Sequence, residues 1–142
     1  MKVYITENID RVIENYKTIP IIYGKADLSI VPNNAATHIV AIDALDSIPF
    51  SLLGDFIKSI QNKLRAGGHI VLGGLELTAI CQDLLNNNLD TQQFNETILN
   101  KKGLYKNQYI TNLLTRIGLK INNVKIKGYN YEITASRPQV SN

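Results

Sequence analysis

The sequence predicts an α/β fold, a three-layer sandwich in which a mostly parallel sheet ends in a C-terminal antiparallel hairpin. Two observations lead to this prediction. Short apolar runs typical of buried strands alternate with segments that show the apolar spacing of amphipathic helices. The last two strand-like runs lie close enough together to pair through a tight turn. At 142 residues, the chain has the length of one domain, which we assign to residues 1–142.

The first third of the chain predicts two strands and a helix. Residues 2–5 alternate as a short strand does, and residues 19–24 read as a buried strand closed by a glycine. Residues 8–16 carry apolar side chains at helical spacing, namely Ile9, Val12, Ile13 and Tyr16. Residues 26–36 contain proline and asparagine, which are typical of a loop.

The middle of the chain gives the clearest patterns. Residues 37–43 are the strongest buried-strand signal, and residues 51–65 form an amphipathic helix that we expect to stop at Gly67 or Gly68. A strand follows at 69–74. The pattern of residues 75–85 is helical, whereas residues 86–95 read as irregular.

The C-terminal part predicts a helix and a hairpin. Residues 107–117 place five apolar side chains on one helical face, and Gly118 marks the helix end. Residues 119–127 and 129–136 are two strands around a turn at Gly128.

The composition excludes several classes of protein. The net charge of +3 is spread along the chain, so nucleic-acid binding is not favoured. Two histidines and one cysteine, none in ligand spacing, give no support for a metal site. We expect Cys81 to be a buried, inert thiol. No apolar run has membrane-spanning length and no signal-peptide core is visible, so we expect a cytoplasmic protein without a membrane partner.

One long segment resembles a known family. The stretch "HIVAIDALDSIPFSLLGDFIKSIQNKLRAGGHIVLGGLEL" (38–77) is similar to the middle of class I S-adenosylmethionine (SAM)-dependent methyltransferases, and closest to a bacterial and phage group of them. Residues 44–49 stand at one family motif and residues 64–68 at another. The likeness extends over about residues 25–138 and implies a Rossmann-like fold. The abundance of Asn, Ile, Lys and Tyr, which share AT-rich codons, fits a viral source.

The resemblance implies a set of site residues at the carboxyl ends of the strands. Asp27, Leu28, Ile42 and Asp43 would contact the cofactor, Asp43 and Asp46 would serve catalysis, and Tyr105 and Lys106 would contact substrate. Each has a plainer alternative: the aspartates can be loop carboxylates or helix caps, and Tyr105 can pack on the surface.

The start of the chain departs from the family. Family members carry a glycine loop after the first strand, where the backbone approaches the methionine part of SAM. Here that position is Thr6-Glu7-Asn8, and no glycine occurs before Gly24. Only one of two expected crossovers fits before Gly24, and the acid that usually holds the ribose hydroxyls has no clear counterpart. We therefore expect no cofactor, or SAM bound weakly.

Two functions remain open at this point. The first is a methyltransferase-like fold with a degenerate cofactor site that serves as a non-catalytic binding or assembly module, with a protein partner. The alternative is a reduced SAM-dependent methyltransferase acting on a small molecule or sugar, with its site completed by a second subunit. A missing crossover leaves apolar surface around residues 19–24, so we also expect a homo-oligomer, a dimer.

Overall fold

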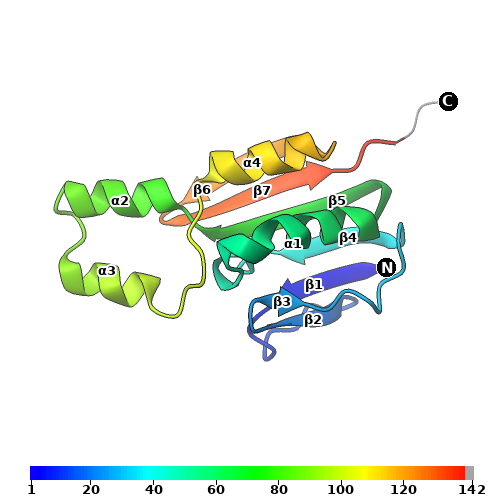
Figure 1. Cartoon of the computed structure of the whole chain (residues 1–142), viewed down its shortest axis with the longest axis horizontal. Helices are drawn as coiled ribbons and strands as arrows, with labels where there is room; N and C mark the ends of the chain where they lie inside the picture. The colour runs from blue at the N-terminus through cyan, green and yellow to red at the C-terminus, as the bar shows by residue number, and fades with distance from the viewer. Residues whose placement is uncertain (140–142) are drawn as a thin grey trace.

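A computed structural model describes residues 1–139, which form one seven-stranded sheet in the order β3-β2-β1-β4-β5-β7-β6 (Figure 1). The predicted α/β fold with a C-terminal antiparallel hairpin is confirmed. The strands are β1 (Lys2–Thr6), β2 (Lys17–Ile22), β3 (Lys25–Ala26), β4 (Ala36–Ala41), β5 (Leu64–Leu75), β6 (Lys120–Lys127) and β7 (Asn130–Ser136).

The centre of the sheet is parallel and both edges are antiparallel. β1 pairs in parallel with β2 and β4, and β4 pairs in parallel with β5. β3 folds back against β2, and β7 lies antiparallel between β5 and β6. The chain runs from β1 towards one edge and returns to start β4 on the other side of β1. The carboxyl ends of β1 and β4 therefore form the switch point at which sheets of this kind bind ligands.

Two of the four helices in residues 1–139, α1 (Phe50–Lys63) and α4 (Asn107–Arg116), pack on one face of the sheet (Figure 1). The other two are α2 (Leu77–Leu85) and α3 (Thr91–Ile98), and a short 3-10 turn, η1 (Leu45–Ser47), precedes α1. α1 contacts β5 and α4, while α4 contacts β6 and β7. α2 and α3 project beyond the carboxyl end of β5 (Figure 1). The main core lies between this face and the helices, and includes Ile39, Ile57, Ile70, Ile110 and Ile133.

In residues 1–139 no helix packs on the opposite face of the sheet (Figure 1). The predicted helix at 8–16 is wrong, because this segment consists of turns. The side chain of Asn8 accepts a hydrogen bond from the backbone N–H of Asp10, which favours a turn. Asn15 has a φ of 68°, which no helix accommodates. Ile9 and Val12 are 67% and 74% exposed, so the apolar spacing has nothing to pack against.

Three further details correct the sequence predictions. α3 lies partly in the segment predicted to be irregular, and a capping box between Asp90 and Gln93 starts it. α1 ends at Lys63, and β5 begins at Leu64, so the glycines at 67 and 68 lie within a strand. The thiol of Cys81 is exposed.

Candidate ligand site at the carboxyl edge of the sheet

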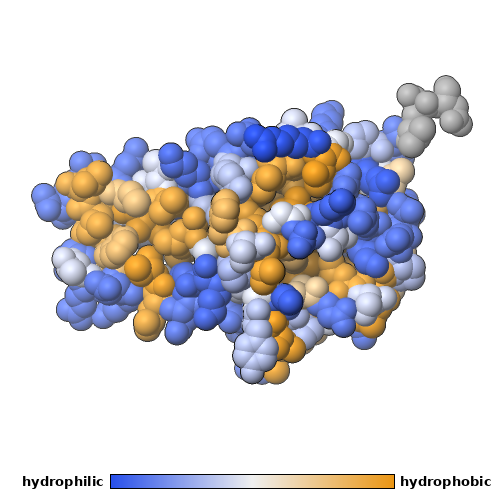
Figure 2. All heavy atoms as spheres, in the orientation of Figure 1, coloured by the Kyte–Doolittle hydropathy of each residue, from blue (hydrophilic) through white to orange (hydrophobic). Residues whose placement is uncertain are grey.

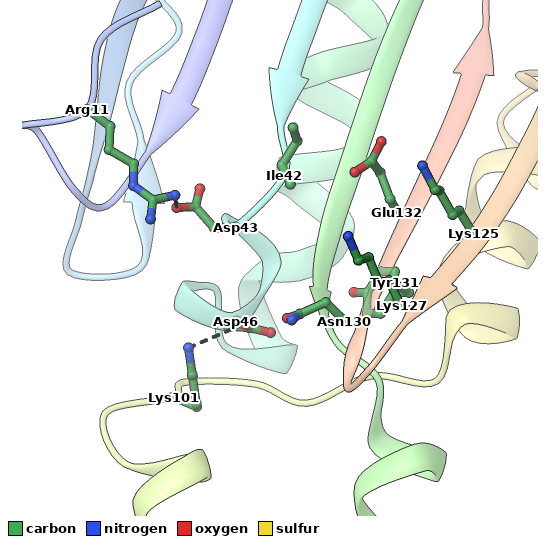
Figure 3. A pocket seen from close by; sticks show the side chains of 10 residues that line it. All are labelled: Arg11, Ile42, Asp43, Asp46, Lys101, Lys125, Lys127, Asn130, Tyr131 and Glu132. Atoms are coloured by element: carbon green, nitrogen blue, oxygen red, sulfur yellow. Dashed lines mark hydrogen bonds and ion pairs between the residues drawn. The ribbon is translucent and has the colours of Figure 1, made fainter.

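A cavity of about 630 Å³ opens at the carboxyl end of β4 (Figure 3). Its walls come from the turns after β1, the loop after β4, the segment before α4 and the β6–β7 hairpin. The lining residues are Arg11, Ile42, Asp43, Asp46, Lys101, Lys125, Lys127, Asn130, Tyr131 and Glu132. The volume is that of a typical small-molecule site. The sequence-predicted residues Ile42, Asp43 and Asp46 therefore lie together.

Asp43 forms one wall of the cavity. Its Oδ2 pairs with the guanidinium of Arg11 at 3.3 Å, and both side chains are partly exposed. Its Oδ1 is buried and has no hydrogen-bond partner among the described residues. A buried carboxylate oxygen without a donor is costly, so this atom is a ready acceptor for a ligand group.

Asp46 is more deeply buried and connects three segments. Its Oδ1 accepts a hydrogen bond of 2.7 Å from the backbone N–H of Leu75, and its Oδ2 pairs with Lys101 at 3.4 Å. Its carbonyl oxygen accepts hydrogen bonds from the backbone N–H groups of Lys102 and Gly103. Burial raises the pKa of the Asp46 carboxyl, although the hydrogen bond from Leu75 and the charge of Lys101 oppose the shift.

The glycine pair at the end of β5 allows this close packing. A Cβ at Gly73 would lie 2.2 Å from the carbonyl oxygen of Ile42 and 2.7 Å from that of Tyr131. A Cβ at Gly74 would lie 2.5 Å from Oδ1 of Asp46. Glycine is therefore needed at both positions because a side chain would collide with neighbouring atoms. Neither position has the positive φ that would by itself favour glycine.

The switch point between β1 and β4 is bridged by the protein's own side chains. Glu7, in the turn after β1, accepts a hydrogen bond from the hydroxyl of Ser47 in the loop after β4. The Arg11–Asp43 pair joins the same two segments. Thr6 is fully buried, and its Oγ1 accepts a hydrogen bond from the backbone N–H of Asn8. The turn after β1 is thus tied down against the loop after β4.

The two other cofactor residues suggested by the resemblance lie elsewhere. Asp27 is exposed next to β3, and hydrogen bonds from Ser29 lower the pKa of its carboxyl. It lines a separate small hollow at the β2–β3 edge. Leu28 is buried in the main core. Neither residue lines the cavity that contains Asp43.

The two residues suggested for substrate contact line a groove on the helical face. Tyr105 and Lys106 lie there with Phe50, Leu77 and Tyr109. The hydroxyl of Tyr105 donates a hydrogen bond of 2.5 Å to the carbonyl oxygen of Ile48, and burial raises its pKa to about 12. Apolar side chains cluster on this side of the molecule over α2 (Figure 2). Tyr105 thus holds the loop after β4 in place from a groove outside the Asp43 cavity.

Sequence reasoning missed the basic residues of the cavity. The sequence pattern places Arg11 in a helix, and it places Lys125 and Lys127 in a hairpin strand without indicating a site. The signal for the lysines was present in the run Lys125-Ile126-Lys127, because alternate residues of a strand point to the same face. Nothing in the sequence predicted that Arg11 would meet Asp43.

The structure limits other kinds of site. Among residues 1–139, no group of three or more His, Cys, Asp or Glu side chains is arranged to hold a metal ion. None of the helices in the same residues is long and apolar enough to cross a membrane.

No protein-family model and no curated protein matches the sequence. Solved structures do match, and several of them are methyltransferases. An O-methyltransferase family protein from Burkholderia thailandensis superposes with a TM-score of 0.63 at 12% identity, over 89% of this chain. The chain has the methyltransferase fold. It spans 37% of the length of the Burkholderia protein.

Two further matches support the same fold. A SAM-dependent methyltransferase from Archaeoglobus fulgidus has a TM-score of 0.61 at 11% identity, over 94% of this chain and 74% of that protein. A chain of the complex between the Haloferax volcanii Trm112 methyltransferase activator and a methyltransferase has a TM-score of 0.62 at 8% identity. That match covers 94% of this chain and 66% of that one. At these identities the likeness concerns the fold.

Proposed function

We propose that this protein is a non-catalytic binding module built on the methyltransferase fold. The observation that carries the proposal is the bridge between Glu7 and Ser47 at the switch point of the sheet. Ligands of such sheets enter the crevice between the strands that diverge there. In this chain that crevice is spanned by a side-chain hydrogen bond and, beside it, by the Arg11–Asp43 ion pair.

The turn after β1 also lacks the means to approach a cofactor closely. A ligand that packs against backbone N–H groups needs glycine there, since a Cβ keeps it at a distance. Thr6, Glu7 and Asn8 all carry side chains, and the turn is held by hydrogen bonds of its own. β2 ends at Ile22 and is followed by Tyr23, so no carboxylate stands at its end to hold ribose hydroxyls.

The alternative is a reduced SAM-dependent methyltransferase, and one observation favours it. Asp43 and Asp46 line a single cavity of ligand size, and burial raises the pKa of Asp46. A carboxyl group with a raised pKa is better suited to accept a proton from a substrate hydroxyl. In this alternative a second subunit would supply the cofactor contacts that the turn after β1 lacks.

A protein partner also belongs to this proposal. The matched Haloferax volcanii structure is a complex with a methyltransferase activator. We infer by analogy that a binding module with this fold would act through another protein. We further propose a homodimer that forms at the β2–β3 edge, where Ile22 and Tyr23 are 58% and 96% exposed.

Calorimetric titration of the full chain with SAM, and with its demethylated product, tests the proposal. We expect no saturable binding of either compound up to about 1 mM, which corresponds to a binding free energy weaker than about −4 kcal/mol. The Glu7→Ala and Ser47→Ala variants, each of which removes the Ser47–Glu7 hydrogen bond, show whether loss of the bridge admits SAM. Micromolar binding of SAM to the wild type, abolished by Asp43→Asn, would establish the enzyme alternative instead.

A further inference from the structure

We propose that the carboxyl-edge cavity binds a small phosphomonoester that carries hydroxyl groups, with Lys125 and Lys127 holding the phosphate and Asp43 accepting a hydrogen bond from a hydroxyl. The inference rests on the binding role proposed above and names the chemistry of its ligand. Two independent features of the cavity carry it: the cations of Lys125 and Lys127, which form no ion pair within residues 1–139, and the unpartnered Oδ1 of Asp43.

The charges of the cavity are only partly neutralised. It is lined by four cations and three carboxylates. The ion pairs found in residues 1–139 are Arg11–Asp43 and Lys101–Asp46. Glu132 on β7 lies directly opposite Lys125 on β6, but the two side chains do not form an ion pair. Two ammonium groups therefore face a single remaining carboxylate, which leaves the β6–β7 side of the cavity positive.

The two lysines are placed to act together. They occupy alternate positions of β6, so their side chains leave the same face of the strand about 6–7 Å apart. Figure 3 shows both on the hairpin side of the cavity, across from Arg11 and Asp43. Lysine is a compact cation on a flexible stem, and two such stems can converge on one phosphate group.

The wall of the cavity opposite the two lysines contains an acceptor, Oδ1 of Asp43, that lacks a hydrogen-bond donor. Oδ1 of Asp43 is buried without a partner, while its other oxygen is held by Arg11. A hydroxyl of the ligand would satisfy that oxygen, and the amide of Asn130 adds a second polar contact on the hairpin side. A simple inorganic anion would meet the lysines but leave Asp43 unsatisfied.

The chemistry differs from that of SAM, whose reactive centre is a sulfonium cation. An unbalanced pair of lysines repels such a group and attracts a phosphate dianion. β6 is an edge strand, and lysines on edges also hinder pairing with other chains. If the lysines only protected the edge strand, replacing any of them would have the same effect on ligand binding. Lys120 lies on the same strand but does not line the cavity, so it is a matched control.

The test is calorimetric titration at low ionic strength with ribose 5-phosphate, ribose and inorganic phosphate. We expect ribose 5-phosphate to bind more tightly than either of the other two compounds. Lys125→Gln and Lys127→Gln should each weaken binding by about tenfold, as expected for loss of a charge-assisted hydrogen bond, and Lys120→Gln should leave it unchanged. Asp43→Asn should reduce the advantage of ribose 5-phosphate over inorganic phosphate. Circular dichroism melts verify that all four variants are folded.

Three results would overturn the inference. They are absence of binding at about 1 mM ribose 5-phosphate, equal affinity for inorganic phosphate, and equal weakening by Lys120→Gln. These results leave the non-catalytic role intact if SAM also fails to bind. Conversely, tight binding of SAM to a protein that still binds ribose 5-phosphate overturns the non-catalytic role alone.

Discussion

Asp46 accepts a hydrogen bond from the backbone N–H of Leu75, and this contact fastens the loop after β4 to the end of β5. The two residues are 29 positions apart, and the contact is buried. Together with Lys101, Asp46 sets where the floor of the cavity lies.

Removal of the Asp46 side chain should lower the free energy of unfolding. Asp46→Ala leaves the N–H of Leu75 buried without an acceptor, at a cost of about 1–3 kcal/mol. Asp46→Asn keeps an acceptor oxygen and should cost less than the alanine variant. Urea unfolding measures both, with Asp55→Ala on the exposed side of α1 as the control expected to change stability by at most about 0.5 kcal/mol. Equal losses in all three variants would contradict a specific role for Asp46.

The stability of the protein should also depend on the protonation of Asp46. Burial raises the pKa of this carboxyl in the folded state, so folding favours the protonated form. The resulting stability is fully present below the unfolded pKa of about 3.9 and is lost as the pH rises through the folded pKa. Urea unfolding between about pH 3 and pH 6 should show the wild type losing stability relative to Asp46→Asn. A difference that grows in favour of the wild type as the pH rises would reverse the sign assigned to this group.

Gly73 and Gly54 should respond to alanine in opposite directions. A Cβ at Gly73 meets two backbone carbonyl oxygens that cannot move without disturbing β4 or β7. We expect Gly73→Ala to destabilise the protein by about 1–3 kcal/mol. At Gly54, in α1, nothing lies within 4 Å of the added carbon. Gly54→Ala should therefore raise stability by about 0.5–1 kcal/mol, since alanine favours the helix. Thermal unfolding of the pair checks both signs, and a neutral Gly73→Ala would refute the close approach of the three strands.

The proposed dimer can be tested at the β2–β3 edge. Ile22 and Tyr23 are exposed there, and an apolar contact of this kind typically joins two copies. Multi-angle light scattering at micromolar concentration should give the mass of a dimer for the wild type and of a monomer for Ile22→Lys. Leu99→Lys, at another exposed apolar position, should remain dimeric. A monomeric wild type would disprove the dimer.

Sequence patterns predicted the parts of this fold that bury a regular face. The run at 37–43 and the apolar stripe of 51–65 gave β4 and α1 to within a few residues, because each packs against the same core. The pattern at 8–16 misled, since Ile9 and Val12 have helical spacing but no partner surface in the fold. The spacing of apolar residues in a segment shows which face of a helix could be buried. It does not show whether another part of the fold lies against that face.

The candidate site was only partly predictable for a similar reason. Asp43 and Asp46 could be placed from the position of β4, because side chains that follow parallel strands gather at one edge. Arg11 and Lys127 reach the same cavity from segments more than a hundred residues apart in the sequence, and no local pattern encodes that meeting. The bridge from Glu7 to Ser47 depends likewise on the path of a turn.

The irregular link between β1 and β2 bears on how this protein could be changed. Residues 7–16 run over the surface, and their ends are fixed by two paired strands. The entropy cost of closing a loop grows only slowly with its length, by about 0.6 kcal/mol for each doubling. A glycine turn followed by a helix could therefore be spliced between Thr6 and Lys17 without rebuilding the sheet. The link between β1 and β2 is therefore a suitable place for an insertion. A longer link would add a helix on the second face of the sheet and a glycine turn that could bind a cofactor.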